Sequence, residues 1–135
     1  LRTTARKGLK INYISTKQLP GENLTEKKKT ETGYITVSNP LLTAIDLISY
    51  QKRIGGLNRA STVISELVET IKPGDVNIEL IKYASVSSLQ RLGFILEKVV
   101  NKKDVAEKLF SLCKRSGIKF YLIPLKASGK KKRRL

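Results

Sequence analysis

The chain has 135 residues and a formal net charge of +16, and 40% of its residues are apolar. This length allows one domain with its own hydrophobic core, and the absence of any apolar run of about 18 residues excludes a transmembrane helix. Residues 1–16 lack the apolar stretch of a signal peptide. The single cysteine, Cys113, excludes an internal disulfide and fits a reducing compartment. We therefore expect a cytoplasmic protein with no membrane partner.

The chain is predicted to begin with two strands separated by a loop. Residues 9–16 form the first strand, because Leu9, Ile11 and Tyr13 alternate with polar residues. Residues 17–32 are polar, charged and rich in turn-forming residues, which is typical of an exposed loop. A second, short strand is predicted over residues 34–37.

A helix, a glycine break and a second helix follow. Asn39 can accept hydrogen bonds from amides of the first turn, and Pro40 suits the first helical position. Apolar residues recur at helical spacing until Gly55 and Gly56, where positive backbone angles allow the first helix to end. A second amphipathic helix extends to about residue 71. Gly55 and Gly56 are interpreted as structural residues, because no glycine-rich phosphate-binding motif is present.

Three more helices and a last strand are predicted after the Pro73–Gly74 break. The helices cover residues 75–84, capped by Asp75, about 87–100, starting at Ser87 or Ser88, and 103–115, and the strand covers residues 118–124. Gly93 lies inside the fourth helix, where glycine costs up to about 1 kcal/mol relative to alanine. We expect close approach of a neighbouring element to offset this cost.

These elements predict an α+β domain. About five helices would form a compact helical core, and about three strands from the two chain ends would meet in one small sheet. The domain is predicted to cover residues 1–125, with an exposed loop at residues 17–32. Residues 126–135 are predicted to be a basic, disordered tail.

The positive charge is concentrated at the two ends. Residues 1–32 contain eight basic and three acidic side chains, residues 33–101 seven and six, and residues 102–135 twelve and two. This distribution favours attraction to a polyanion. The aromatic residues form no base-stacking series, so we expect contacts mainly to phosphates. The candidate nucleic-acid-binding residues are Arg2, Arg6, Lys7, Lys10, Lys130, Lys131, Lys132, Arg133 and Arg134. For residues 130–134 we favour a disordered tail with nonspecific affinity over a specific binding role.

The composition argues against enzymatic chemistry. The chain has no histidine, which removes the commonest general base and metal ligand. Cys113 is expected to be a buried apolar residue. Asp46 is expected to be structural, paired with Arg91, Arg53 or a backbone amide, because a partly buried charge needs a partner. Arg91 is expected to make a hydrogen bond between helices. We expect no catalytic residues, no metal and no cofactor.

Two segments of the sequence resemble a known family. YITVSNPLLTAIDLISYQKRIGGLNRASTVISELVE at residues 34–69 and SSLQRLGFILE at residues 87–97 resemble the C-terminal domain of AbiEi antitoxins of type IV toxin-antitoxin systems. The resemblance implies a nucleotidyltransferase-like toxin as partner and an upstream winged helix-turn-helix that binds operator DNA. No segment before Leu9 can form such a winged helix, so the chain would be the C-terminal portion of the antitoxin.

Two functions are therefore weighed. The first is an antitoxin of an abortive-infection system that neutralises a toxin of the same operon, with or without direct contact, and assists DNA-binding autoregulation with an upstream winged-helix domain. The alternative is a stand-alone basic domain that binds DNA or RNA. Binding that depends steeply on salt, with little sequence preference and no linked toxin, would favour the alternative.

Overall fold

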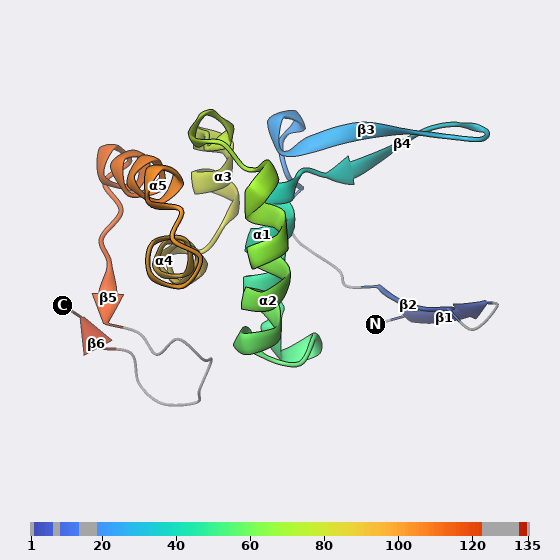
Figure 1. Cartoon of the computed structure of the whole chain (residues 1–135), viewed down its shortest axis with the longest axis horizontal. Helices are drawn as coiled ribbons and strands as arrows, with labels where there is room; N and C mark the ends of the chain where they lie inside the picture. The colour runs from blue at the N-terminus through green and yellow to red at the C-terminus, as the bar shows by residue number, and fades with distance from the viewer. Residues whose placement is uncertain (1, 7–8, 14–18, 123–132, 135) are drawn as a thin grey trace.

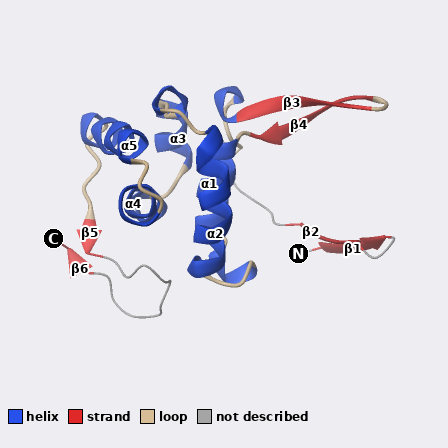
Figure 2. Ribbon diagram, viewed as in Figure 1, coloured by secondary structure: helices blue, strands red, loops and turns tan. Residues whose placement is uncertain are grey.

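The computed structural model describes residues 2–6, 9–13, 19–122 and 133–134, and its class is α+β (Figures 1 and 2). The helices are α1 (Pro40–Ser49), α2 (Leu57–Leu67), α3 (Ile78–Tyr83), α4 (Val86–Phe94) and α5 (Lys103–Arg115). α4 continues directly into a π-helix at Ile95–Val99. Short 3₁₀ turns occupy Glu22–Leu24, Gln51–Arg53, Val68–Thr70 and Pro73–Asp75. The predicted mixed class and five helices are confirmed.

The strands form three separate antiparallel pairs. They are β1 (Arg2–Arg6) with β2 (Leu9–Tyr13), β3 (Thr25–Thr30) with β4 (Gly33–Ser38), and β5 (Tyr121–Leu122) with β6 (Arg133–Arg134). The predicted single sheet of three strands is therefore wrong for the described residues, because each strand pairs with the next strand along the chain. Residues 14–16, 123–124 and most of the predicted tail lie outside the described residues, and Arg133–Arg134 within that tail form β6.

The predicted loop at residues 17–32 contains the strand β3, so that prediction is wrong over residues 25–30. β3 pairs with β4 from Thr25 opposite Ser38 to Thr30 opposite Gly33. Neither face of this hairpin is buried against the helices, since Lys27, Lys28 and Lys29 are all exposed. A strand that is solvated on both faces lacks the apolar alternation by which strands are recognised in a sequence.

The predicted cap of α1 is confirmed, whereas the predicted starts of α3 and α4 are wrong. α4 begins at Val86 and is capped by Ser85, so it starts one or two residues before the predicted start at Ser87 or Ser88. Asn39 accepts a hydrogen bond from the backbone N–H of Leu42 at 2.8 Å, as a cap of α1 should. α3 is capped by Asn77 and not by Asp75. Asp75 closes its own 3₁₀ turn, where its Oδ2 accepts from the backbone N–H of Lys72 at 2.8 Å. The Pro73–Gly74 break therefore forms a turn before α3 begins.

The α1–α2 connection is longer than predicted. α1 ends at Ser49, and a 3₁₀ turn follows before Gly55 and Gly56, which have φ angles of +103° and +98°. Both angles are ones that glycine adopts at little cost. The two glycines therefore reverse the chain after α1 and allow α2 to start at Leu57 and pack beside α1.

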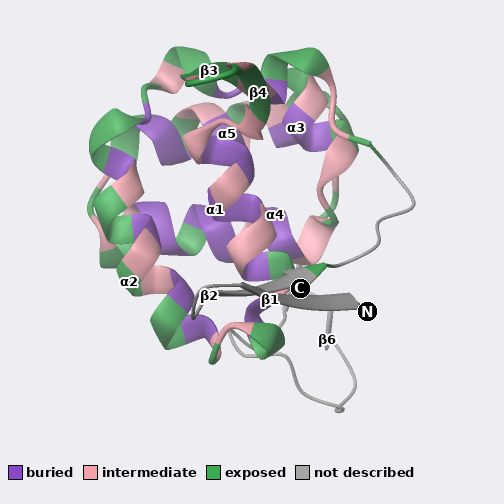
Figure 3. Cartoon of the chain, turned by 90° about the vertical axis from the view of Figure 1, so that its right-hand side faces the viewer, coloured by how far each residue is buried: buried purple, intermediate pink, exposed green. Residues whose placement is uncertain are grey.

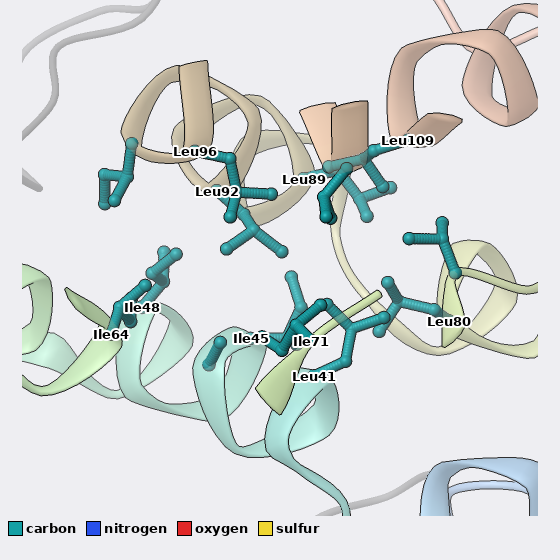
Figure 4. Close-up of a cluster of buried hydrophobic side chains, with 14 of the residues drawn as sticks. Leu41, Ile45, Ile48, Ile64, Ile71, Leu80, Leu89, Leu92, Leu96 and Leu109 are labelled. Atoms are coloured by element: carbon teal, nitrogen blue, oxygen red, sulfur yellow. The ribbon is translucent and has the colours of Figure 1, made fainter. Parts of the chain in front are cut away.

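The core lies between the helices. α1 packs against α2 and α4, and α4 packs against α5. Figure 3 shows buried residues along these helices. Figure 4 shows side chains of α1 and α4 pointing toward one another. The largest fully buried side chains are Leu24, Leu41, Ile45, Ile48, Ile64, Ile71, Leu80, Leu89, Leu92, Ile95, Leu96 and Leu109. Among the described helices, none has the length and apolarity needed to cross a bilayer.

Two large apolar residues at helix ends are exposed and lie outside the core. Ile78 at the start of α3 is 46% exposed and Val99 is 55% exposed. Val99 ends the π-helix, whose i→i+5 hydrogen bonds change the rotation per residue, so the apolar stripe of α4 does not continue to it. Gly93 is close to a neighbouring element, as predicted, because a Cβ built on it would collide with the ring of Phe110 of α5.

Candidate functional site

A pocket of about 380 Å³ lies where the C-terminal end of α1 meets the N-terminal end of α4. α1 stops at Ser49, and Ser85 caps α4, so the two helix ends and the 3₁₀ turn after α1 border the same space. We call it the α1–α4 pocket. Its lining residues are Ile48, Ser49, Tyr50, Gln51, Lys52, Arg53, Ser85, Ser87, Ser88 and Arg91.

Serine hydroxyls connect the two helices beside this pocket. The Oγ atoms of Ser49 and Ser88 are 3.0 Å apart, within hydrogen-bond distance. Ser85 Oγ donates to Ser88 Oγ at 3.0 Å and accepts from the backbone N–H of Ser88 at 3.2 Å. Ser88 is buried, so these bonds satisfy a polar group that would otherwise be costly inside the protein. No histidine or carboxylate lines the pocket to activate a hydroxyl. The hydrogen bond between Ser49 and Ser88 joins α1 to α4.

The charged residues of the pocket are all basic. Lys52 and Arg53 are exposed, whereas Arg91 is 8% exposed. Burial lowers the pKa of the Arg91 guanidinium from its ordinary value, although an arginine remains charged at neutral pH. The positive lining can attract an anion but contains no acid–base pair for catalysis.

Asp46 has a structural partner that differs from those predicted. Its Oδ1 accepts a hydrogen bond from the hydroxyl of Tyr83 at 2.9 Å, which links α1 to α3. The carboxyl group is half-buried, and this burial raises its pKa above the ordinary value, while the hydrogen bond from Tyr83 acts in the opposite direction. The two residues are 37 positions apart. No spacing rule in the sequence could have paired them.

Cys113 and a second, larger pocket show no arrangement suited to catalysis or metal binding. Cys113 is fully buried, as predicted, and its burial raises the pKa of the thiol. A larger pocket of about 570 Å³ lies between α2 and the end of the π-helix, and Glu69 is the one acidic residue in its lining. Within the described part of the chain, no group of three or more histidine, cysteine or acidic side chains could hold a metal ion.

The predicted phosphate-binding residues that the structure describes lie on two separate strand pairs, β1 with β2 and β5 with β6. Arg2 and Arg6 lie on β1, Lys10 on β2, and Arg133 and Arg134 on β6. The remaining predicted residues, Lys7, Lys130, Lys131 and Lys132, lie outside the described residues.

The basic residues of β3 were not predicted as part of a strand. Lys27, Lys28 and Lys29 were assigned to a loop, but they lie opposite Thr36, Ile35 and Tyr34 of β4, respectively. The signal in the sequence was two short segments, Thr25–Thr30 and Gly33–Ser38, with two residues between them. Such spacing is typical of a tight hairpin.

The sequence was compared with known protein families. Residues 10–98, about two thirds of the chain, match the family described as the AbiEi antitoxin C-terminal domain. The chain belongs to this family. The matched part extends from β2 into the π-helix and contains both segments on which the resemblance rested, whereas α5 lies outside it. Neither the curated proteins nor the solved structures gave a match.

Proposed function

We propose that this AbiEi-family chain neutralises a nucleotidyltransferase-like toxin encoded in the same operon, as part of a type IV abortive-infection system in the cytoplasm. The observation that carries the proposal is the family match over residues 10–98, because it covers α1 to α4 and thus most of the helical core. The toxin-antitoxin role follows from the family, and the identity of the toxin is our inference.

Binding of other molecules, and not catalysis, is the chemistry that the described surface supports. The α1–α4 pocket combines positive charge with serine hydroxyls but lacks a carboxylate. The one half-buried carboxylate with a shifted pKa, Asp46, is occupied by a hydrogen bond from Tyr83. We therefore propose a non-enzymatic protein that acts through its surfaces.

A second part of the proposal is autoregulation at operator DNA. The basic chain ends would bind phosphates while an upstream winged-helix domain reads the sequence. The net charge of +16 and its concentration outside residues 33–101 support this part. A stand-alone nucleic-acid-binding domain remains the second candidate, supported by the same charges.

Co-expression with the toxin gene adjacent to the chain's own gene tests the antitoxin proposal. Cells that produce the toxin and the chain should grow, whereas cells that produce the toxin alone should stop growing. Co-purification of the two proteins then separates direct contact from indirect neutralisation. Failure of growth with folded chain present would favour the nucleic-acid-binding candidate, provided that the chain binds nucleic acid with a steep salt dependence.

A further inference from the structure

The hairpin of β3 and β4, residues 25–38, extends away from the helices in Figure 1. We call it the ribbon. Directly opposed residues of an antiparallel pair point to the same face, and the faces alternate along each strand. The register pairs Lys27 with Thr36 and Lys29 with Tyr34, so these four side chains share one face, which we call the lysine face.

The opposite face of the ribbon has a different character. The register pairs Lys28 with Ile35 and Glu26 with Val37 there. The Nζ of Lys28 is 3.2 Å from Oε1 of Glu26, so an acidic residue offsets its charge. Lys27 and Lys29 have no carboxylate within ion-pair distance among the described residues. The ribbon thus separates two lysines without acidic partners from a third that has one.

An exposed aromatic ring distinguishes the lysine face from an ordinary solvated strand. Tyr34 is 69% exposed and lies opposite Lys29. Lysines alone would serve to protect a free strand edge from pairing with another chain, but such protection does not require an exposed tyrosine. Two cations beside an aromatic ring form a surface that can contact phosphates, sugars and base edges together.

The base of the ribbon is fixed to the helices. The carboxylate of Glu79 in α3 accepts hydrogen bonds from Asn23, from its backbone N–H at 3.1 Å and from its Nδ2 at 3.0 Å. The backbone N–H of Asn39 donates to the carbonyl oxygen of Leu24 at 2.9 Å, and Leu24 is fully buried. These contacts anchor the segments on both sides of the hairpin, so its direction is set before a partner binds, which lowers the entropic cost of binding.

We propose that the lysine face of the ribbon binds duplex DNA, with Lys27 and Lys29 contacting phosphates and Tyr34, which lies beside Lys29, facing the groove. A two-stranded ribbon fits the major groove of B-DNA, which is about 12 Å wide. The inference rests on the nucleic-acid-binding part of the proposed function and assigns it a surface within the family-matched residues. It is independent of toxin neutralisation.

The test uses three single variants of the whole chain that lose the same charge from the same strand. Lys27→Gln and Lys29→Gln alter the lysine face, and Lys28→Gln is the matched control on the opposite face. Fluorescence anisotropy measures binding to a labelled DNA duplex of mixed sequence, about 20 base pairs long, between about 50 and 200 mM salt. Circular dichroism checks that each variant is folded, and every variant retains the basic chain ends.

Lys27→Gln and Lys29→Gln should each reduce the magnitude of the slope of log K against log salt concentration (the salt slope) by about 1. Each should also reduce the affinity at 0.1 M salt by about eightfold. Lys28→Gln should change both much less. Equal effects of all three variants would show that only net charge matters, and no effect of any would place binding at the chain ends; either result would overturn the inference. Tighter binding to single strands through the same lysines would overturn the groove assignment.

The results that would refute DNA binding by the ribbon differ from those that would refute the proposed antitoxin function. A chain that protects cells from the toxin but shows the same salt slope for all three variants refutes the ribbon alone. A chain that gives no protection but loses affinity in Lys27→Gln and Lys29→Gln refutes the antitoxin role alone.

Discussion

The hydroxyl of Tyr83 donates a hydrogen bond of 2.9 Å to Oδ1 of Asp46, and this bond joins α3 to α1. The acceptor is a half-buried carboxylate, for which loss of a hydrogen bond costs more than for a neutral group. Asp46 is also the one acidic residue of α1. The bond therefore offsets part of the cost of keeping a charge at a helix interface.

Tyr83→Phe should lower the free energy of unfolding by about 1–2 kcal/mol, because the carboxylate of Asp46 loses its donor while the aromatic ring is kept. Urea unfolding at neutral pH measures the change. Tyr50→Phe is the matched control, since no hydrogen bond of its hydroxyl is found among the described residues, and it should change stability by less than about 0.5 kcal/mol. Equal effects of the two substitutions would contradict a specific role for the Tyr83 hydroxyl.

The pH dependence of stability should change in Asp46→Asn. Burial raises the pKa of Asp46 in the folded state above its ordinary value of 3.8, so the folded state binds this proton more tightly than the unfolded state. The contribution of Asp46 to stability therefore falls as the pH rises through 3.8 toward the raised pKa, and stays low above it.

Asparagine keeps an acceptor for Tyr83 and has no charge to lose. The stability of Asp46→Asn relative to the native chain should consequently increase as the pH rises from about 3 to 7. Urea titrations at several pH values measure this difference, in which the other carboxyl groups cancel. A difference that stays flat or decreases with pH would show that burial of Asp46 does not disfavour its charge.

The packing of Gly93 against Phe110 predicts a coupled pair of substitutions. Gly93→Ala should destabilise the fold by about 1–3 kcal/mol, because the added methyl group collides with the ring of Phe110 and overpacks the α4–α5 interface. The ring has little room to tilt, since it packs edge-on against Phe120 with centroids 5.8 Å apart. Thermal and urea unfolding measure the effect.

Removing the ring should remove the penalty. In a Phe110→Leu background, Gly93→Ala should be neutral or stabilising, because alanine is the better helix former by up to about 1 kcal/mol. Gly74→Ala is the control, as no atom lies within 4 Å of its added Cβ. Additive effects of the changes at Gly93 and Phe110 would contradict a direct collision.

Asn39 should matter through its side-chain oxygen. Asn39→Ala removes the acceptor for the backbone N–H of Leu42 and should cost about 1–2 kcal/mol. Asn39→Asp keeps this acceptor but loses the Nδ2 donor that contacts the carbonyl oxygen of Asn23 at 3.2 Å. The aspartate variant should lie between alanine and the native chain in urea unfolding. An aspartate variant as unstable as alanine would assign the main role to the contact with Asn23.

Local chemistry was readable from the sequence where it acts over a few residues. The Asn39–Pro40 start of α1, the range of α5 and the burial of Cys113 were predicted because they depend on capping, on helical spacing and on the apolar character of free cysteine. The resemblance to AbiEi antitoxins rested on residues 34–69 and 87–97, and the family match contains both.

Features that depend on contacts between residues far apart in the sequence, or on a strand that has no buried face, could not be predicted in this way. The partner of Asp46 comes from α3, and only the folded arrangement brings Tyr83 to it. The ribbon has no buried face, so β3 carries lysines where apolar alternation would normally identify a strand. The prediction of a single sheet was wrong because each strand pairs with the next one along the chain. Such pairing closes shorter loops than joining the two chain ends, and shorter loops cost less entropy.

Colony counts under toxin induction test the antitoxin role most directly. Cells should carry the inducible toxin gene together with the native chain, an empty vector, or a chain carrying Gly93→Val as a packing-disrupted control. The native chain should restore the colony number of the uninduced culture, and the empty vector should not. A colony number as low as with the empty vector, in cells that contain the native chain in folded form, would contradict the antitoxin role.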